Sequence, residues 1–281
     1  MLEASWLESC LREDIGDGDV TTEALIVGDK TVEAFILPRE AGVACGLDLA
    51  KPIAQALGGE LEDFHYIEDG SPLVPGENCA SFRGSHALLL KVERLYLNLI
   101  QRLCGVATTT QKYVDAISHT KAKILDTRKT APGMRALEKR AVLAGGGQNH
   151  RMGLFDAFLI KENHLQAYRN QPNPFLSALE AARCSRGDLP LIIEVESLEE
   201  MDLALEGLPD VILLDNFSVD QMKEAVLRLS KLNEVPLLEA SGGIRLETLA
   251  GVAEAGVDRI SVGAITHSAR PLDLSLLIRD I

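Results

Sequence analysis

The chain has 281 residues, of which 46% are hydrophobic and 25% charged, and its formal net charge at pH 7 is -14. This length suits two lobes better than one small core, and the composition is that of a chain folded throughout. The negative charge repels nucleic acids and anionic lipids over most of the surface, which argues against both as partners.

The sequence lacks several patterns that would indicate a membrane protein, a secreted protein or a zinc site. No apolar run comes near the roughly 20 residues that a membrane-spanning helix needs. The residues around Trp6 lack the basic start and apolar centre of a secretory signal. We therefore expect a cytoplasmic protein with no membrane partner. The five cysteines contain no CxxC pair, which fits reduced thiols that pack in the core and fits neither a zinc site nor a disulfide framework.

The first 105 residues show a mixture of helical and extended patterns that predicts a separate α/β lobe. The pattern predicts helices at 2–13 and 47–57 and extended runs at 31–38 and 78–83. A long helical pattern follows from Lys91 to about His119 and is interrupted near Gly105. We expect this helix to join the first lobe to the rest of the chain.

From about residue 122 onward, short runs rich in Ile, Leu and Val alternate with amphipathic patterns, which is typical of βα units and a parallel sheet. The predicted strands are 123–127, 157–160, 191–195, 211–214, 236–239 and 259–262. The predicted helices between them are 175–183, 198–205, 219–229 and 246–255. Ser197, with Glu200 three residues later, predicts a capping box at the start of one helix.

Polar residues or glycine stand at the end of every predicted strand. They are Arg128 and Lys129, Lys161 and Glu162, Glu194 and Glu196, Asp215 and Asn216, Glu239 with Ser241, Gly242 and Gly243, and Gly263. In α/β-barrels the carboxyl ends of the strands converge on one face, where catalytic and phosphate-binding groups gather. The alternative is that loops are simply polar. That alternative accounts poorly for Glu194, Glu196 and Asp215, because an unpaired carboxylate beside an apolar run is costly to bury.

Positive charge is concentrated in one short segment of this acidic chain. Residues 128–161 hold seven Lys or Arg against Glu138 and Asp156, a local net charge of +5, so the remaining residues carry -19. Such a concentration predicts a cleft that attracts a small anion. The alternative, for Arg135, Lys139 and Arg140 at helical spacing, is a solvated basic helix face.

Two glycine-containing stretches predict phosphate contacts. Gly242 follows Ser241 directly after a predicted strand, and Gly263 follows the last strand with His267 nearby. Glycine lets the backbone approach an anion closely, and the next helix can direct N–H groups at it. The alternative is a pair of tight turns that need glycine. The stretch 144–151 is rich in glycine and includes His150 and Arg151, which predicts a mobile loop that collects anions.

Taken together, these residues resemble the quinolinate phosphoribosyltransferase family, also called nicotinate-nucleotide pyrophosphorylase, nearly end to end. The motifs that carry the resemblance are 13–22 (EDIGDGDVTT), 93–94 (ER), 101–103 (QRL), 126–133 (DTRKTAPG), 145–154 (GGGQNHRMGL), 159–164 (LIKENH), 213–217 (LLDNF), 239–244 (EASGGI) and 260–264 (ISVGA). Ile192 and Cys104 depart from the family pattern, which usually has Glu and Ser there. Neither departure touches a residue assigned below.

The resemblance implies a type II phosphoribosyltransferase architecture. This is an N-terminal α/β sandwich-like domain, residues 1–105, and an incomplete α/β-barrel catalytic domain, residues 106–267. It also implies that residues 268–281 pack back on the first domain. The implied assembly is a homodimer that shares its sites, with Arg94 reaching in from the second subunit, and a higher oligomer stays open.

The implied reaction transfers phosphoribose from phosphoribosyl pyrophosphate to quinolinate with loss of CO2, giving nicotinate mononucleotide in NAD biosynthesis. The family pattern places Arg128, Lys129, His150, Arg151 and Lys161 around the quinolinate carboxylates and donor phosphates. Glu194 and Asp215 match an acidic pair near ribose and Mg2+, which is held indirectly through water and substrate. Ser241, Gly242, Gly263 and His267 match the 5-phosphate site. The expected catalytic residues are Lys129, Lys161, Glu194 and Asp215, and no organic cofactor is implied.

Two other interpretations stay open. A lysine at a strand end can form a Schiff base, so Lys161 or Lys129 would suit an aldolase-like lyase. A non-catalytic relative, of the kind that accompanies molybdate transport, is the other. The intact runs 149–151 (NHR) and 161–164 (KENH) argue against it.

Overall fold

The computed structural model describes residues 3–28, 30–185, 187–232 and 234–281. The chain divides into two compact units, each of which is described by itself. The first unit comprises Met1–Gln111, Ala131–Gly146 and Ser268–Ile281, and the second comprises Lys112–Thr130 and Gly147–His267. The domain boundaries expected near residues 105 and 267 stay predictions.

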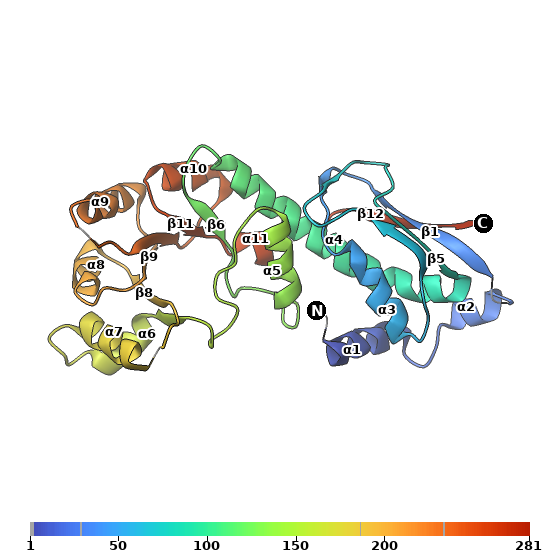
Figure 1. The fold of residues 1–281 in the computed structure, drawn as a ribbon, viewed down its shortest axis with the longest axis horizontal. Coiled ribbons are helices and arrows are strands. Elements are labelled where there is room, and N and C mark those ends of the chain that lie inside the picture. Colours follow the sequence, from blue (N-terminus) through green and yellow to red (C-terminus); the bar gives the residue numbers. More distant parts are fainter. Residues whose placement is uncertain (1–2, 29, 186, 233) are drawn as a thin grey trace. The chain divides into compact units, whose positions relative to one another are not determined.

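The first unit is built on a four-stranded antiparallel sheet with strand order β12-β1-β5-β3 (Figure 1). The strands are β1 (Thr31–Pro38), β3 (Glu62–Tyr66), β5 (Ala80–Ser85) and β12 (Leu274–Asp280). Alternate residues of β1 are buried, as the two-residue period of a strand with one covered face requires. A small sheet pairs β2 (Gly42–Val43) with β4 (Pro72–Leu73).

Helices complete the first unit. They are α1 (Ala4–Ile15), α2 (Val20–Leu25), η1 (Leu47–Leu49), α3 (Ala50–Ala56), α4 (His86–Ala116), whose last turn lies in the second unit, and α5 (Arg135–Ala144). The helix expected at 2–13 is α1, and Leu2 lies outside the described residues. The helix expected at 47–57 begins as a 3-10 turn before α3.

The interruption predicted near Gly105 is wrong, because α4 runs through it without a break. A Cβ atom at Gly105 would collide with the carbonyl group of Arg270, and the adjacent Pro271 lies within 3.0 Å of that position. Glycine is therefore needed here for the close passage of another backbone segment rather than to end the helix.

The second unit contains a six-stranded parallel sheet with strand order β6-β11-β10-β9-β8-β7. The strands are β6 (Lys123–Leu125), β7 (Phe158–Ile160), β8 (Leu191–Val195), β9 (Val211–Asp215), β10 (Leu237–Ser241) and β11 (Arg259–Ser261). Its helices are α6 (Glu162–Leu165), η2 (Gln166–Tyr168), α7 (Pro174–Ser185), α8 (Leu198–Leu205), α9 (Val219–Leu229), α10 (Leu246–Glu254) and α11 (Ala264–His267). Helices α7 to α10 lie outside the strands in Figure 1.

The second unit agrees closely with the sequence-based expectation. All six predicted strands and all four predicted helices are present, with ends that differ by no more than two residues. Ser197 caps α8 by accepting a hydrogen bond from the backbone N–H of Glu200. The strand order is linear, from β6 to β7, so the sheet is that of an incomplete barrel. The predicted fold class, an N-terminal α/β domain with an incomplete α/β-barrel, is thus confirmed.

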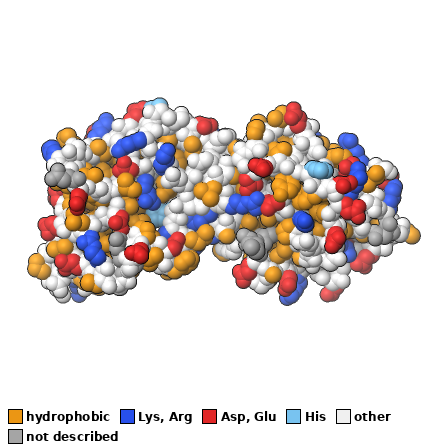
Figure 2. All heavy atoms as spheres, in the orientation of Figure 1, with side chains coloured by type: hydrophobic (Ala, Val, Ile, Leu, Met, Phe, Trp, Pro, Cys, Tyr) orange, Lys and Arg blue, Asp and Glu red, His pale blue; other side chains and the backbone are white. Residues whose placement is uncertain are grey.

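Two surface properties bear on function. Among the described residues, no helix is long and apolar enough to cross a membrane. On the face shown in Figure 2, basic and acidic side chains are intermixed with hydrophobic ones, so the negative net charge does not produce one uniform acidic surface there.

The five cysteines are free; Cys45, Cys79 and Cys104 are buried, whereas Cys184 is exposed and does not pack in the core.

Candidate active site

The strand registers of the second unit bring the predicted site residues to one edge of the sheet. Ser241 pairs with Asp215 across β10 and β9, and Ser261 pairs with Leu125 across β11 and β6. Ile160 pairs with Ile193, so the next residues, Lys161 and Glu194, lie side by side. The carboxyl ends of six parallel strands therefore present their polar side chains at the same edge.

Lys161 and Glu194 form an ion pair at this edge, between Lys161 Nζ and Glu194 Oε2. The carboxylate is largely buried, with 13% of its side chain exposed, whereas the lysine side chain is 44% exposed. The backbone N–H of Lys161 donates to Nδ1 of His164 at 3.0 Å, which fixes the start of α6. A lysine held in this way presents a positive charge to the solvent side of the edge.

A second group of cations lies near the end of β6. Partial burial and the nearby charge of Arg128 lower the pKa of Arg151 below its ordinary value. Two adjacent guanidinium groups repel each other unless an anion lies between them, so this pair suits a dicarboxylate or a phosphate. Arg151 also donates through Nη1 to the carbonyl oxygen of Ala157 at 3.2 Å.

Lys129, Gly263 and His267 are neighbours. A Cβ atom built at Gly263 would lie 3.1 Å from His267 Cδ2 and 3.2 Å from Lys129 Cδ. The buried hydroxyl of Thr266 donates to the backbone carbonyl of Lys129 at 2.8 Å and so holds the loop after β6 against α11.

The glycines after β10 adopt backbone conformations that other residues rarely use. Gly242 has φ of 94° and Gly243 has φ of 57°. A Cβ atom at Gly242 would also collide with Asn216, whose backbone N–H donates to the carbonyl of Ser241 at 2.9 Å. The turn therefore requires glycine, which supports the tight-turn interpretation. The same turn is compatible with a phosphate contact through its backbone N–H groups.

Carboxylates gather at the ends of β8 and β9. Desolvation, followed by the charges of Glu162, Glu200, Asp215 and Glu194, raises the pKa of Glu196. Asp215 accepts a hydrogen bond from the side chain of Asn216 at 2.8 Å. No group of three metal-ligating side chains occurs among the residues that the structure describes. A cation at this edge would thus rely on one or two carboxylates plus water and substrate oxygens, the arrangement that Mg2+ prefers.

His150 faces into the protein. Its Nε2 lies 3.2 Å from Glu239 Oε1, and its Nδ1 accepts the backbone N–H of Arg151 at 2.7 Å. Its own backbone N–H donates to Asp126 at 2.8 Å. The mobile loop expected at 144–151 is thus anchored, and Gln148 forms a bridge to Leu125 that extends the sheet.

Three buried polar residues, Asp126, Glu239 and Ser261, and the partly exposed Arg259 have no role assigned from the sequence, although Glu239 is among the polar residues expected at the strand ends. Glu239 and Asp126 have no exposed surface. The available signal was a charged side chain within or directly after an apolar strand, since such a group must be paired when it is buried.

Several predicted residues belong to the first unit. Arg94 is an exposed residue of α4 in the first unit. Arg135, Lys139 and Arg140 belong to α5, also in the first unit. Lys139 is buried, and Arg140 is paired with Asp48 and Asp69. Arg140 is thus neutralised by two carboxylates, and the solvated-face alternative is wrong for Lys139.

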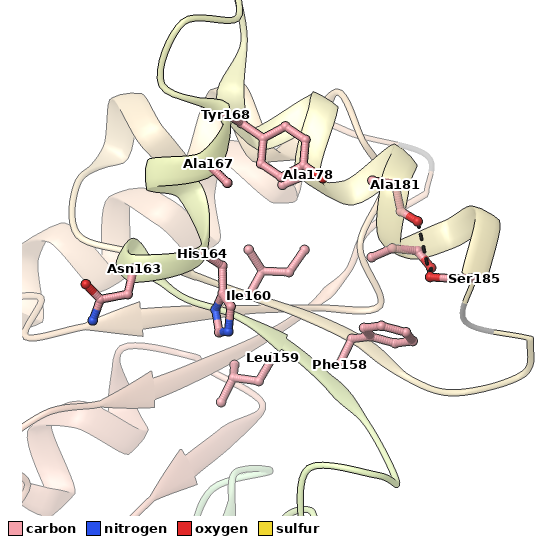
Figure 3. Close-up of a pocket in the computed structure, with 11 residues that line it drawn as sticks. Phe158, Leu159, Ile160, Asn163, His164, Ala167, Tyr168, Ala178, Ala181 and Ser185 are labelled. Atoms are coloured by element: carbon pink, nitrogen blue, oxygen red, sulfur yellow. Dashed lines mark hydrogen bonds between the residues drawn. The ribbon is translucent and has the colours of Figure 1, made fainter.

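A pocket of about 520 Å³ lies beside β7, bounded by α6, η2 and α7 (Figure 3). Phe158, Ile160 and Tyr168 contribute apolar surface, and His164 on α6 contributes the imidazole drawn at its centre. None of the predicted site residues is among the described residues that line it. The pocket is therefore separate from the row of charges at the strand ends.

Comparison with known proteins identifies both parts of the chain. Residues 19–104 match the family model of the quinolinate phosphoribosyl transferase N-terminal domain, and residues 106–277 match that of the C-terminal domain. The chain is 43% identical over 273 residues to the nicotinate-nucleotide pyrophosphorylase [carboxylating] of Mycobacterium leprae, covering 96% of this chain and 95% of that protein. It is 41% identical over 266 residues to a probable enzyme of the same name from Bacillus subtilis, covering 94% and 89%.

A solved structure agrees with these relationships. The nicotinate-nucleotide pyrophosphorylase from Francisella tularensis superimposes with a TM-score of 0.89 at 37% sequence identity, covering 98% of this chain and 95% of the other. The agreement thus extends over both units and over nearly the full length of the relatives. The chain belongs to the quinolinate phosphoribosyltransferase family.

Proposed function

We propose that this protein catalyses the decarboxylating transfer of phosphoribose from phosphoribosyl pyrophosphate to quinolinate, in NAD biosynthesis. A bond forms between the quinolinate nitrogen and ribose C1, and the bond from C1 to pyrophosphate breaks. The C2 carboxylate then leaves as CO2, and a proton takes its place on the ring. The family name "pyrophosphorylase [carboxylating]" describes the same reaction in reverse.

The observation that carries this proposal is the separation of charge along one sheet edge. Partial burial and the charge of Arg128 lower the pKa of Arg151, and Lys161 pairs with Glu194 at the same sheet edge. The reaction requires such an arrangement, because a dicarboxylate and a pyrophosphate must be held together while positive charge develops on the ribose.

Each group has a proposed role. Arg128 and Arg151 bind the quinolinate carboxylates, Lys129 and Lys161 bind donor phosphate and carboxylate oxygens, and His150 contributes to the same subsite. Glu194 and Asp215 stabilise the developing oxocarbenium charge. The residues proposed for the 5-phosphate are Ser241, Gly242, Gly263 and His267.

Mg2+ is the proposed metal, bound to the pyrophosphate of the donor. The repulsion among carboxylates that raises the pKa of Glu196 favours a cation at this edge. Glu194 and Asp215 would hold the metal through water and substrate oxygens, and its charge would stabilise the leaving pyrophosphate. We propose no organic cofactor, and the cytoplasm as the compartment.

We further propose a homodimer in which Arg94 completes the site of the partner subunit. Arg94 is exposed on α4 although its neighbours Leu95 and Tyr96 are buried, so its guanidinium is available to a second chain. Arg94→Ala and Lys161→Ala subunits should each be inactive alone and should regain part of their activity when mixed. Verified mixed dimers without activity would refute the shared site.

The direct test is to incubate the protein with magnesium, phosphoribosyl pyrophosphate and carboxyl-labelled quinolinate, and to measure CO2 and nicotinate mononucleotide. Equal amounts of both products are expected, and neither should form without the donor. Borohydride trapping separates the lyase alternative, because phosphoribosyl transfer forms no imine. Covalent trapping of a carbonyl substrate together with no nucleotide would overturn the proposal.

A further inference from the structure

A buried group of charges lies beneath the strand-end residues of the second unit. Glu239 on β10 is fully buried and is the register partner of Arg259 on β11. It is also two residues before Ser241 on the same strand, so it lies one layer below the site edge. A buried carboxylate is costly unless it is paired, which raises the question of what it does there.

The two carboxylate oxygens of Glu239 serve different partners. Oε1 accepts the hydroxyl of Ser261 and lies 3.2 Å from Nε2 of His150. Oε2 faces Nε of Arg259 at 3.1 Å, in an ion pair whose geometry does not make a hydrogen bond. Burial acts to raise the pKa of Glu239, but His150, Arg259 and Ser261 outweigh it and the pKa is lowered. Glu239 is therefore ionised.

The hydrogen bonds of His150 define its protonation state. Nδ1 accepts the backbone N–H of Arg151 at 2.7 Å, so it carries no proton. In the neutral ring the proton is then on Nε2, which lies 3.2 Å from Glu239 Oε1. The imidazole thus links the buried carboxylate to the backbone of Arg151, one of the cations proposed to bind quinolinate.

We infer that Glu239 is a positioning residue, which holds His150 in its Nε2-protonated form and thereby fixes the backbone from which Arg151 reaches the substrate. The inference rests on the proposed function only for its effect on quinolinate binding. Glu239 acts through His150 and lies a layer below the site edge. Arg259 keeps the Glu239 carboxylate ionised, and the hydrogen bond from Ser261 fixes its orientation.

Substitution by glutamine tests this because an amide has only one acceptor oxygen. In Glu239→Gln, either His150 or Arg259 must face the NH2 group. The amide oxygen should face Arg259, because a charged partner makes the stronger interaction. We expect KM for quinolinate to rise about tenfold, and KM for phosphoribosyl pyrophosphate to change less than about twofold. The double variant Glu239→Gln/Arg259→Met frees the amide oxygen for His150 and should recover most of the loss.

A general loss of stability would give a different result. In that case the second substitution would add to the damage, and both KM values would change together. The matched control is Glu254→Gln, which removes the carboxylate from an exposed pair with His119 in the same unit and should leave both KM values unchanged. An unaltered KM for quinolinate in Glu239→Gln, or no recovery in the double variant, would overturn the inference.

A second measurement needs no substrate and so separates this inference from the proposed function. Nitrogen NMR of the full-length protein with 15N-labelled histidine reports which ring nitrogen carries the proton, and His150→Gln identifies the signal. We expect the Nε2–H form in the wild type and a mixture of forms in Glu239→Gln. The Nδ1–H form in the wild type would refute the positioning role, whereas failure to make nicotinate mononucleotide would refute only the proposed reaction.

Discussion

The basic segment 128–161 supplies two groups of cations, which differ in how far carboxylates balance their charge. The α5 group is Arg135, Lys139 and Arg140, and the strand-end group is Arg128, Lys129, Arg151 and Lys161. In the α5 group, Arg140 donates to Asp48 at 2.6 Å and to Asp69 at 2.6 Å, and Lys139 is buried. Among the described residues, neither Lys129 nor Arg151 forms an ion pair with a carboxylate, whereas Lys161 is paired with Glu194.

The difference shows that local charge density does not define a binding site. Arg140, which two carboxylates neutralise, stabilises the fold, whereas Arg151, whose pKa is lowered by partial burial and by the charge of Arg128, remains able to bind an added anion. Asp69 also accepts the backbone N–H of Gly46 at 2.9 Å, so Arg140 ties a turn to α5. The two groups should therefore respond differently to substitution.

The largest effect should come from the strand-end group. Arg128→Ala should lower turnover with quinolinate at least roughly tenfold, about 1.4 kcal/mol in the barrier, because a contact to the substrate carboxylate is lost. Arg128 is exposed, so the midpoint of thermal unfolding should change little. Steady-state kinetics and calorimetry on the same preparation check both parts. Unchanged kinetics would remove Arg128 from the site.

A smaller effect of the opposite kind should come from the α5 group. Arg140→Ala should lower the free energy of unfolding by about 1 kcal/mol, because a bidentate but partly exposed pair is lost. Turnover should stay within about twofold of the wild type. Lys121→Ala is the matched control, since its pair with Asp258 is more exposed and should contribute less. Denaturant titration measures the loss of unfolding free energy. A drop in turnover with unchanged stability would show that the α5 group does not differ from the strand-end group in its role.

The smallest effect should come from Glu196, one of the carboxylates at the ends of β8 and β9. The pKa of Glu196 is raised, so the folded protein binds this proton more tightly and stability falls as pH rises from the ordinary carboxyl value through the raised one. Glu196→Gln should therefore raise the thermal midpoint slightly at pH 7 and not at pH 4. Melting curves at both pH values test this. An equal increase at both would show that charge repulsion is not the cause.

The sequence predicts the second unit better than the first, for a physical reason. Each βα unit there is local, and apolar strands such as Leu191–Val195 are flanked by helices with clear caps. By contrast, β3 (Glu62–Tyr66) is largely exposed and has no apolar run, so it was missed. The pairing of Gly105 with a segment 165 residues later is likewise invisible to local patterns.

Much of the candidate site was also accessible, because strand ends in a parallel sheet converge wherever the strands are placed correctly. The pairing of Lys161 with Glu194 follows from the register of β7 and β8. No role for Glu239 or Asp126 could be assigned from the sequence, because both roles depend on partners in distant segments. A buried charge in a strand can be detected from sequence, but its partner cannot.

The long pairing of β12 with β1 has a consequence for synthesis on the ribosome. β12 follows the whole second unit in sequence, and its residues pair with β1 from Val32 to Pro38, with Leu274 opposite Pro38. During translation the first sheet must wait with that side of β1 unpaired until the second unit has emerged. Chaperones that shield exposed strands are therefore expected to matter most for this protein until β12 has left the exit tunnel.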